Sequence, residues 1–512
     1  MTQGEIEKLT VKVSNIFSEL EVRIMTDIVR RIKENSFASA SVDWQISRLQ
    51  QLGMAEEDIR GWIQSALQAT DAEMDRIFSD EVYKQYYEQE HFFKLAGMQQ
   101  IPLEENFVLQ QLIEATKKQL QGEYKNLTGS MGFAIRNPAT GRIQSSPLLE
   151  YYRTTMDQAV IDIKSGAFDY NTVLKRTVNQ MTASGLRYIE YDSGHRDRID
   201  VAARRAILTG FRQVQGKIME MLANQLGTDL YEVSYHVGAR PTHQPWQGKV
   251  WSMQELKQVC GLGEITGLKG INCYHDYKPI PPGAKRTYTD EQLQKMLEEE
   301  NTPKEYNGKQ YTTYEALQQQ RKMERGMRAQ RQKIKLLQQG GADEQEIILA
   351  KAKYQGQMQT YKDFSEKMKL PEQKARIMQD GLKGKFMPTK AEQKVLEESA
   401  INDKIKADMK AVGMRGEINL KPEIPDVSKL SFDEHHINQE RQHNVTESEA
   451  KSYIQKAVFS TTKWKGKFTN YYSDEGAAFV DNETQHIKTA FKKEQYDEAA
   501  TAAMEVLKNG WS

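Results

Sequence analysis

The stretch HRDRIDVAARRAILTGFRQVQGKIMEMLANQLG, residues 195–227, carries the strongest helix signal in the middle of the chain. Its apolar residues recur at helical spacing, and Gly227 stands where a glycine commonly ends a helix. Directly after it, residues 230–237 are rich in aromatic and β-branched residues in alternation, which is typical of a strand. Residues 238–283 are predicted to form Gly- and Pro-rich loops with short strands.

Helical periodicity dominates the rest of the chain. Apolar residues recur three or four apart near the N-terminus, at Ile6, Leu9, Val13, Ile16 and Leu20. We therefore predict a mainly α, multidomain fold with α+β parts. Five segments are expected: a helical N-terminal module (1–128), a loop-rich α/β centre (129–300), a basic helical arm (301–412), a linker (413–430) and a small C-terminal α+β domain (431–512).

Bulk composition excludes several classes of protein. The 512 residues exceed what a single core usually serves. Lys+Arg and Asp+Glu both number 71, so the net charge gives no general attraction to nucleic acid or to anionic membranes. No run of 18 apolar residues occurs, so no membrane span is expected. The two cysteines are too few for a disulfide framework, which favours synthesis in a reducing cytosol.

The central loops concentrate His236, His243, Cys273 and His275, four side chains that can bind a metal. Cys273 and His275 could share one ion from a short loop, and zinc is the cofactor that this donor set would take. The spacing from His236 to His243 matches no standard zinc finger, however. Two other interpretations remain: a hydrogen-bonded polar core packed on Trp246 and Trp251 without any cofactor, or a catalytic role.

These loops also carry a family resemblance. The segments YHVGARPTHQPWQGKVW (235–251), GLKGINCYHDYKPIPPG (267–283) and YEALQQQRKMERGMRAQRQK (314–333) resemble the signature of the phage minor capsid protein type 2 family. The matching positions are His236, Gly238, Ala239, Arg240, Pro241, His243, Trp246, Gln247, Gly248, Lys249, Val250, Gly270, Asn272, Cys273 and His275. Val237 is inserted before Gly238, and the resemblance covers roughly residues 1–385.

This resemblance implies a virion-structural protein that lies in the head beside the portal protein, with a role similar to that of Mu-type head-morphogenesis proteins. We therefore expect a protein of the capsid interior or portal vertex that is made in the bacterial cytoplasm, is present in several copies per virion and contributes to head assembly and to DNA packaging or ejection. The expected partners are the portal protein and the major capsid protein, with packaged DNA as a further candidate.

The third segment is strongly basic, and Arg321, Arg325, Arg328 and Arg331 fall on nearby faces of one predicted helix. One interpretation is a solvated basic face. The other is contact with DNA phosphates or with an acidic surface of the portal protein.

The C-terminal segment gathers the groups that metal-independent RNA cleavage needs. His436 could act as general acid or base, Arg441 could hold the phosphate, and Lys465, Tyr471 and Thr489 could line the same cleft. The order of these residues resembles phage-borne nuclease domains of the barnase–EndoU–colicin–RelE type. Arg441 is not followed by Gly, however, and the loop after the helix is unusually rich in lysine.

The resemblance of the C-terminal segment defines the alternative function, a virion-carried effector with ribonuclease activity on host RNA. Whether the chain is an enzyme stays open at this stage. A small α+β domain that contacts the host or decorates the capsid is the structural alternative.

Overall fold

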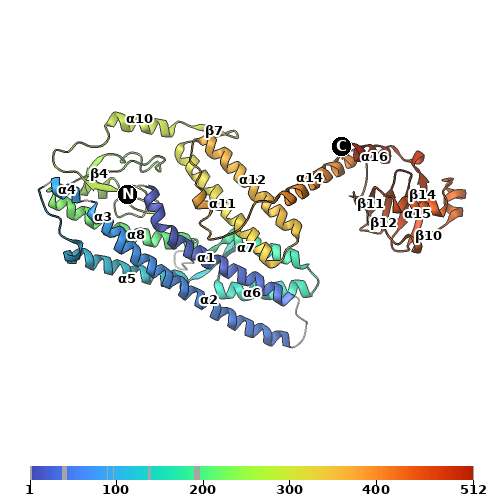
Figure 1. The fold of residues 1–512 in the computed structure, drawn as a ribbon, viewed down its shortest axis with the longest axis horizontal. Coiled ribbons are helices and arrows are strands. Elements are labelled where there is room, and N and C mark those ends of the chain that lie inside the picture. Colours follow the sequence, from blue (N-terminus) through green and yellow to red (C-terminus); the bar gives the residue numbers. More distant parts are fainter. Residues whose placement is uncertain are drawn as a thin grey trace. The chain divides into compact units, whose positions relative to one another are not determined.

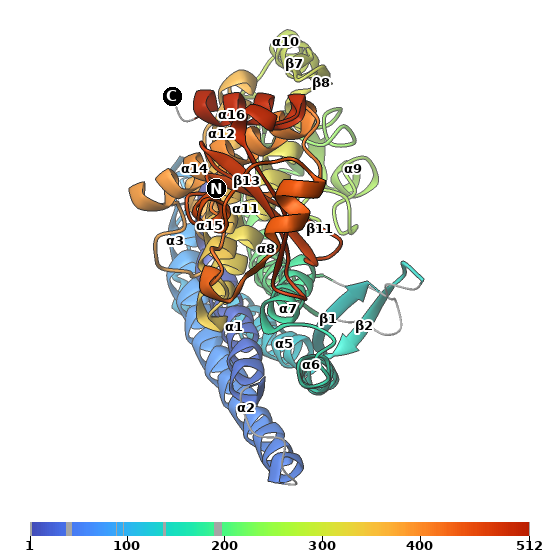
Figure 2. The ribbon, with the colours of Figure 1, turned by 90° about the vertical axis from the view of Figure 1, so that its right-hand side faces the viewer.

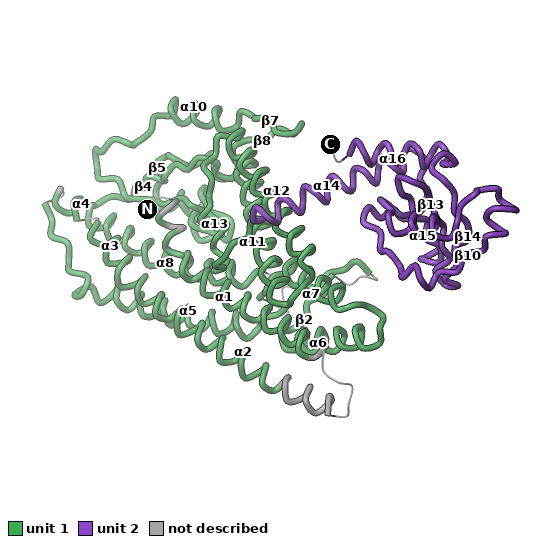
Figure 3. Tube along the Cα trace, turned by 45° about the vertical axis from the view of Figure 1, so that its right-hand side comes forward, with its two compact units in different colours: residues 1–387 green, residues 388–512 purple. Residues whose placement is uncertain are grey.

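The computed structural model describes residues 3–36, 43–88, 90–95, 97–136, 140–188 and 197–510. Helices account for most of these residues, and four small sheets account for the strands. The chain forms two compact units, residues 1–387 and residues 388–512 (Figure 3). The predicted fold class, mainly α with α+β parts in several domains, is confirmed.

Long helices build the first unit. They are α1 (Gln3–Ser36), α2 (Asp43–Arg76), α3 (Val82–Tyr87), α4 (Glu90–Leu95), α5 (Phe107–Gly129), α6 (Leu148–Lys164), α7 (Tyr170–Ser184) and α8 (Ile199–Gln225). A π-helical turn, Ile77–Glu81, joins α2 to α3. Both α2 and α8 contact α1, and α5 packs on α8 (Figures 1 and 2). The helix predicted at 195–227 is confirmed from Ile199 to Gln225.

Amphipathic patterning explains why α1 is central to this unit. Of the residues predicted to form its apolar stripe, Leu9, Val13 and Leu20 are buried and Ile16 is partly buried, while the side chain of Ile6 lies outside the described part of the structure. Phe17 and Ile24 extend the same stripe and are fully buried. Because α1 also contacts α6, α7 and the later helix α11 (Thr313–Gly340), its apolar face holds the N-terminal, central and later segments on one core.

Short antiparallel sheets connect the helices. The first has the order β2-β1-β3, with β1 (Met131–Arg136), β2 (Ile143–Pro147) and β3 (Leu186–Tyr188). The second has the order β5-β4-β6, with β4 (Leu230–Val233), β5 (Val250–Ser252) and β6 (Tyr277–Pro279). The predicted strand at 230–237 is therefore shorter than expected, since β4 ends at Val233. Helix α9 (Met253–Gln258) follows β5, and long loops form the rest of the chain between β4 and β6.

Most of the segment predicted to be a basic arm, residues 301–387, is part of the first unit. It follows α10 (Asp290–Asn301) and contains a hairpin of β7 (Lys304–Tyr306) and β8 (Lys309–Tyr311), then α11, α12 (Glu344–Met368) and α13 (Lys374–Ile377). Helix α11 begins with a capping box and ends at Gly341, whose φ is +71°. It packs on α1, α7 and α12, so it is a core helix and not a solvated arm.

The expected basic face on α11 is therefore wrong. Arg331 is 5% exposed, and its guanidinium donates to Asp380 at 2.6 Å and to the carbonyl of Leu382 at 2.9 Å. Arg328 lies 3.7 Å from the buried Asp200, and Arg321 stacks over the ring of Tyr274. Arg325 is exposed. The local sequence does not predict these ion pairs, because the acidic partners of Arg328 and Arg331 come from distant segments.

The second unit is an α+β domain. Its sheet has the order β10-β14-β13-β12-β11-β9 and is antiparallel except where β10 meets β14. The strands are β9 (Glu417–Asn419), β10 (Ser431–Phe432), β11 (Phe459–Lys463), β12 (Phe468–Tyr472), β13 (Gly476–Asp481) and β14 (His486–Lys492). Helices α14 (Lys390–Ala411) and α16 (Glu498–Gly510) pack on one face, and α15 (Glu447–Gln455) packs on the other.

The boundary between the units differs from the segments drawn from the sequence. The division falls at residues 387 and 388, so α14 belongs with the C-terminal sheet. The segment predicted to be a linker, 413–430, contributes β9 to that sheet. Its composition is loop-like, but a three-residue edge strand needs few apolar residues when a neighbouring strand supplies the hydrogen bonds. None of the described helices combines the length and the apolar character that crossing a membrane requires.

Arg331→Ala should lower the free energy of unfolding by about 3–5 kcal/mol, because it leaves the Asp380 carboxylate buried without its cation. The exposed Arg325 of the same helix provides the control, and Arg325→Ala should change stability by no more than about 0.5 kcal/mol. Urea unfolding followed by circular dichroism measures both values. Equal effects of the two substitutions would show that the buried pair does not stabilise this unit.

Candidate metal centre

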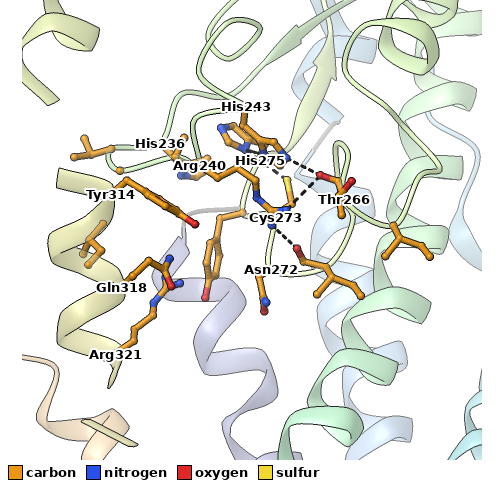
Figure 4. Close-up of a pocket in the computed structure, with 17 residues that line it drawn as sticks. His236, Arg240, His243, Thr266, Asn272, Cys273, His275, Tyr314, Gln318 and Arg321 are labelled. Carbon is orange, nitrogen blue, oxygen red and sulfur yellow. Dashed lines mark hydrogen bonds between the residues drawn. The ribbon is translucent and has the colours of Figure 1, made fainter. Parts of the chain in front are cut away.

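The two loops around the second sheet meet at a buried cluster of His243, Cys273 and His275 (Figure 4). One candidate ligand atom from each residue lies within 4.8 Å of the others, and all three side chains are buried. His243 comes from the loop between β4 and β5, whereas Cys273 and His275 come from the loop that leads into β6. The structure therefore brings together three of the four side chains predicted as metal ligands.

His236, the fourth predicted ligand, lies beside this cluster. Its Nε2 is 3.0 Å from the hydroxyl of Ser234, and its ring centroid is 5.0 Å from that of His275. His236 therefore contributes to the walls of the site and is not one of the three converging ligand atoms.

Hydrogen bonds fix the orientation of both converging imidazoles. The Nε2 of His243 lies 2.8 Å from the carbonyl oxygen of Thr266, and the Nε2 of His275 lies 2.9 Å from Oε1 of Gln247. The same Gln247 oxygen accepts the backbone N–H of His236 at 3.0 Å, which fixes the orientation of that amide. The two rings consequently present their Nδ1 atoms to each other, 3.4 Å apart.

Arginines from other elements hold the loop that carries Cys273. Arg212 of α8 donates to the carbonyls of Lys269 and Gly270 at 3.0 and 2.9 Å, and also to that of Cys273. Arg240 donates to the carbonyl of Ile271 at 2.5 Å. A long loop has few backbone partners of its own, so these guanidinium groups supply the donors that its buried carbonyls need.

A buried ion pair lies next to the cluster. Lys269 Nζ is 2.8 Å from Asp276, and both groups also contact the amide of Gln215. Burial raises the pKa of Asp276, but the Lys269 ammonium outweighs it and lowers that pKa to about 2. The pair ties the loop to α8, which carries Gln215.

Burial favours the uncharged form of the histidines and the thiol in this cluster. Burial lowers the pKa of His243 and of His236, and it lowers that of His275 to about 2. Burial also raises the pKa of the Cys273 thiol. A protonated and 2% exposed thiol is a poor nucleophile, so the geometry does not favour the catalytic interpretation.

Packing around the cluster matches the polar-core interpretation in part. The ring of Trp246 lies 4.5 Å from that of His243 and 4.8 Å from that of His275, between centroids. The indole N–H of Trp251 donates to the carbonyl of Trp246 at 2.9 Å. Trp246 thus forms an apolar wall of the site and Trp251 holds the backbone of Trp246, as a core and a metal centre would both allow.

Sequence reasoning missed some of the groups that support the cluster. Gln247 stands in the quoted motif, and its position four residues after His243 is a signal that could have been used. The carbonyl of Thr266 has no sequence signal, because any residue supplies one. Arg212 lies on a helix about 60 positions away, and only the fold brings it here.

The structure brings His436 and Arg441 together but places Tyr471 and Thr489 on opposite faces of the sheet. His436 is partly exposed, with its Nδ1 2.7 Å from Glu440 and its Nε2 accepting from Arg441 at 3.1 Å. Tyr471 is buried on the sheet face that packs on α15. Thr489 pairs with Phe479, whose side chain packs on the opposite face.

The remaining residue of that set is equally separate in the fold. Lys465 lies in the turn between β11 and β12 with a φ of +55°. Directly paired residues of adjacent strands share a face, so Thr489 lies on the same face as Phe479. Tyr471 lies on the opposite face, and the two side chains therefore cannot line one cleft. The five predicted residues therefore do not form one site, and ribonuclease activity stays a prediction that the fold does not support.

The first unit is thus a helical scaffold whose central loops enclose a His/Cys cluster, and these loops coincide with the sequence blocks that resemble a phage head protein. The family model described as Phage minor capsid protein 2 matches residues 1–366. Because this match covers more than half of the chain, the protein belongs to the phage minor capsid protein 2 family. It is accordingly a structural protein of a phage virion. Searches of curated proteins and of solved structures gave no match.

Gly270→Ala should destabilise the first unit by about 1–3 kcal/mol, the usual cost when an extra methyl group forces a backbone shift. A Cβ at this position would lie 2.4 Å from the carbonyl oxygen of Ile265, in the loop that carries Cys273. Gly122, in the exposed part of α5, has open space around it, and Gly122→Ala serves as the control. Thermal unfolding distinguishes the two. Tolerance of Gly270→Ala equal to that of the control would contradict the tight packing of this loop.

Proposed function

We propose that the protein works at the portal vertex or in the interior of the phage head, where it binds the portal protein. The match of the minor capsid family over residues 1–366 carries this proposal. The resemblance of the three sequence blocks implies a place beside the portal, and the long helices of the first unit are suited to assembly contacts. The major capsid protein is the second expected partner.

Exposed apolar side chains support a docking role for the first unit. They gather where the chain enters α5: Phe107 is 71% exposed, Val108 is 60% exposed and Ile101 is 45% exposed. Large apolar side chains clustered in water commonly mark a protein contact site. We propose residues 98–108 as part of the surface that contacts the portal protein.

The proposed function does not include DNA contact by Arg328 or Arg331 of α11. Arg328 and Arg331 are held by acidic residues of the same unit, so they are not available to phosphates. Of the four arginines predicted to make that contact, Arg325 alone is exposed. Any contribution to packaging is therefore expected to act through protein contacts of the first unit.

Purified phage heads should contain this chain in several copies. Mass spectrometry of full virions and of tail-less heads tests this, and a knockout of the gene should give particles without the protein. A chain that is made in infected cells but is absent from purified heads would contradict the proposal.

The double variant Phe107→Ser with Val108→Ser should weaken binding to purified portal protein at least tenfold while the fold is kept. Both side chains are solvent-exposed, so their loss removes contact area without opening a cavity. Ile161→Ser on α6 is the matched control, since Ile161 is 57% exposed elsewhere on the unit. Surface plasmon resonance gives the affinities, and circular dichroism checks the fold. Equal affinities for the wild type and the double variant would exclude this surface.

A further inference from the structure

The decisive observation is an unpartnered nitrogen in the buried cluster. The acceptor beside each Nε2 is a carbonyl or amide oxygen, which cannot donate, so both Nε2 atoms carry the hydrogen. In a neutral imidazole the other nitrogen is then a bare lone pair. The 3.4 Å contact between the Nδ1 atoms of His243 and His275 is therefore not a hydrogen bond, and Nδ1 of His243 has no partner at 2% exposure.

The thiol of Cys273 completes the set. Its Sγ lies 3.5 Å from Nδ1 of His275 and accepts the backbone N–H of Lys269 at 3.3 Å. In a metal-free protein the S–H could donate to His275, yet His243 would still face an apolar wall and a second lone pair. A buried acceptor left without a donor destabilises the folded state. A cation placed between the three atoms would satisfy all of them.

Two of the three distances between the ligand atoms match tetrahedral zinc. Zinc bonds of about 2.0–2.1 Å to nitrogen and about 2.3 Å to sulfur place neighbouring ligand atoms about 3.3–3.6 Å apart. Two of the three separations here are 3.4 and 3.5 Å, and the third does not exceed 4.8 Å. One thiolate and two imidazoles form a donor set that suits zinc and not magnesium or calcium.

The surroundings also match a metal centre. Ligating histidines commonly donate their second N–H to a backbone carbonyl or another fixed acceptor, which orients the ring. The carbonyl of Thr266 and the amide oxygen of Gln247 fill these two positions. The backbone N–H that approaches Cys273 stabilises a thiolate in the same way.

We infer that His243, Cys273 and His275 bind one Zn²⁺, which joins the loop between β4 and β5 to the loop before β6. The fourth position opens onto a pocket of about 340 Å³ that the three ligands line together with Arg240, Tyr314 and Arg321 (Figure 4). A water molecule completes the tetrahedron there, and the two arginines favour its replacement by a small anion.

The first test measures metal content in the full-length protein. After removal of metal with a chelator and dialysis against Zn²⁺ alone, wild-type protein should retain close to one zinc per chain by plasma mass spectrometry. His243→Gln should reduce the zinc content at least tenfold at the same free zinc concentration. His236→Gln, in the wall of the same site, should leave it unchanged. A folded wild-type protein that retains no zinc would overturn the inference.

The second test identifies the thiolate. Co²⁺ in place of Zn²⁺ should produce a sulfur-to-metal charge-transfer band, and the chain holds only two cysteines, Cys260 and Cys273. The band should persist in Cys260→Ala and disappear in Cys273→Ala. If Cys273→Ala fails to fold, the Cys260→Ala protein still decides, because its band can come only from Cys273. Loss of the band in folded Cys260→Ala would overturn the assignment.

The third test addresses the open position. Azide added to the Co²⁺ protein should change the visible absorption of the metal by replacing the bound water. Arg321→Gln should weaken azide binding several-fold and leave the zinc content unchanged, because Arg321 lines the pocket and offers no ligand atom. A spectrum that does not respond to azide would show a closed site and overturn the open fourth position.

Discussion

The first unit depends on one buried carboxylate, Glu21, which is 1% exposed in the middle of α1. Its oxygens accept from Arg198 at 2.6 Å, from the backbone N–H of Leu186 at 2.6 Å and from Gln332 at 2.8 Å. These donors come from the start of α8, from β3 and from α11. A buried charge is tolerated only when it is paired and hydrogen-bonded, so Glu21 fixes how the N-terminal helix, the centre and α11 meet.

The same constraint recurs wherever polar groups enter this core. Asp200 lies near both Arg198 and Arg328, and Asp380 neutralises Arg331. The pairs that Arg328 and Arg331 form join α11 to segments that lie far from it in the sequence, so α11 is held in the unit by charge as well as by its apolar face. These ion pairs explain why α11, whose sequence predicts a solvent-exposed helix, is part of the scaffold that carries the central loops.

The same need of buried polar groups for partners applies to the central loops around the proposed zinc centre. Arg212 and Arg240 satisfy the loop carbonyls, and the pair of Lys269 and Asp276 anchors the loop to α8. These contacts leave Nδ1 of His243 without a hydrogen-bond partner, beside Nδ1 of His275 and the thiol of Cys273. A metal at that point would connect two of the three segments that resemble the family signature, 235–251 and 267–283, which gives those two segments a physical reason to occur together in a structural protein of a virion.

The sequence by itself determined the helices of the first unit, the mainly α class, the family and the residue types that could bind a metal, because periodicity and short motifs are local properties. Tertiary structure decided the rest. It selected His243, Cys273 and His275 over His236, buried Arg331 against Asp380, and placed Tyr471 and Thr489 on opposite faces of one sheet. Each of these outcomes depends on a partner far away in the chain, and spacing along the sequence carries no information about which distant segments meet.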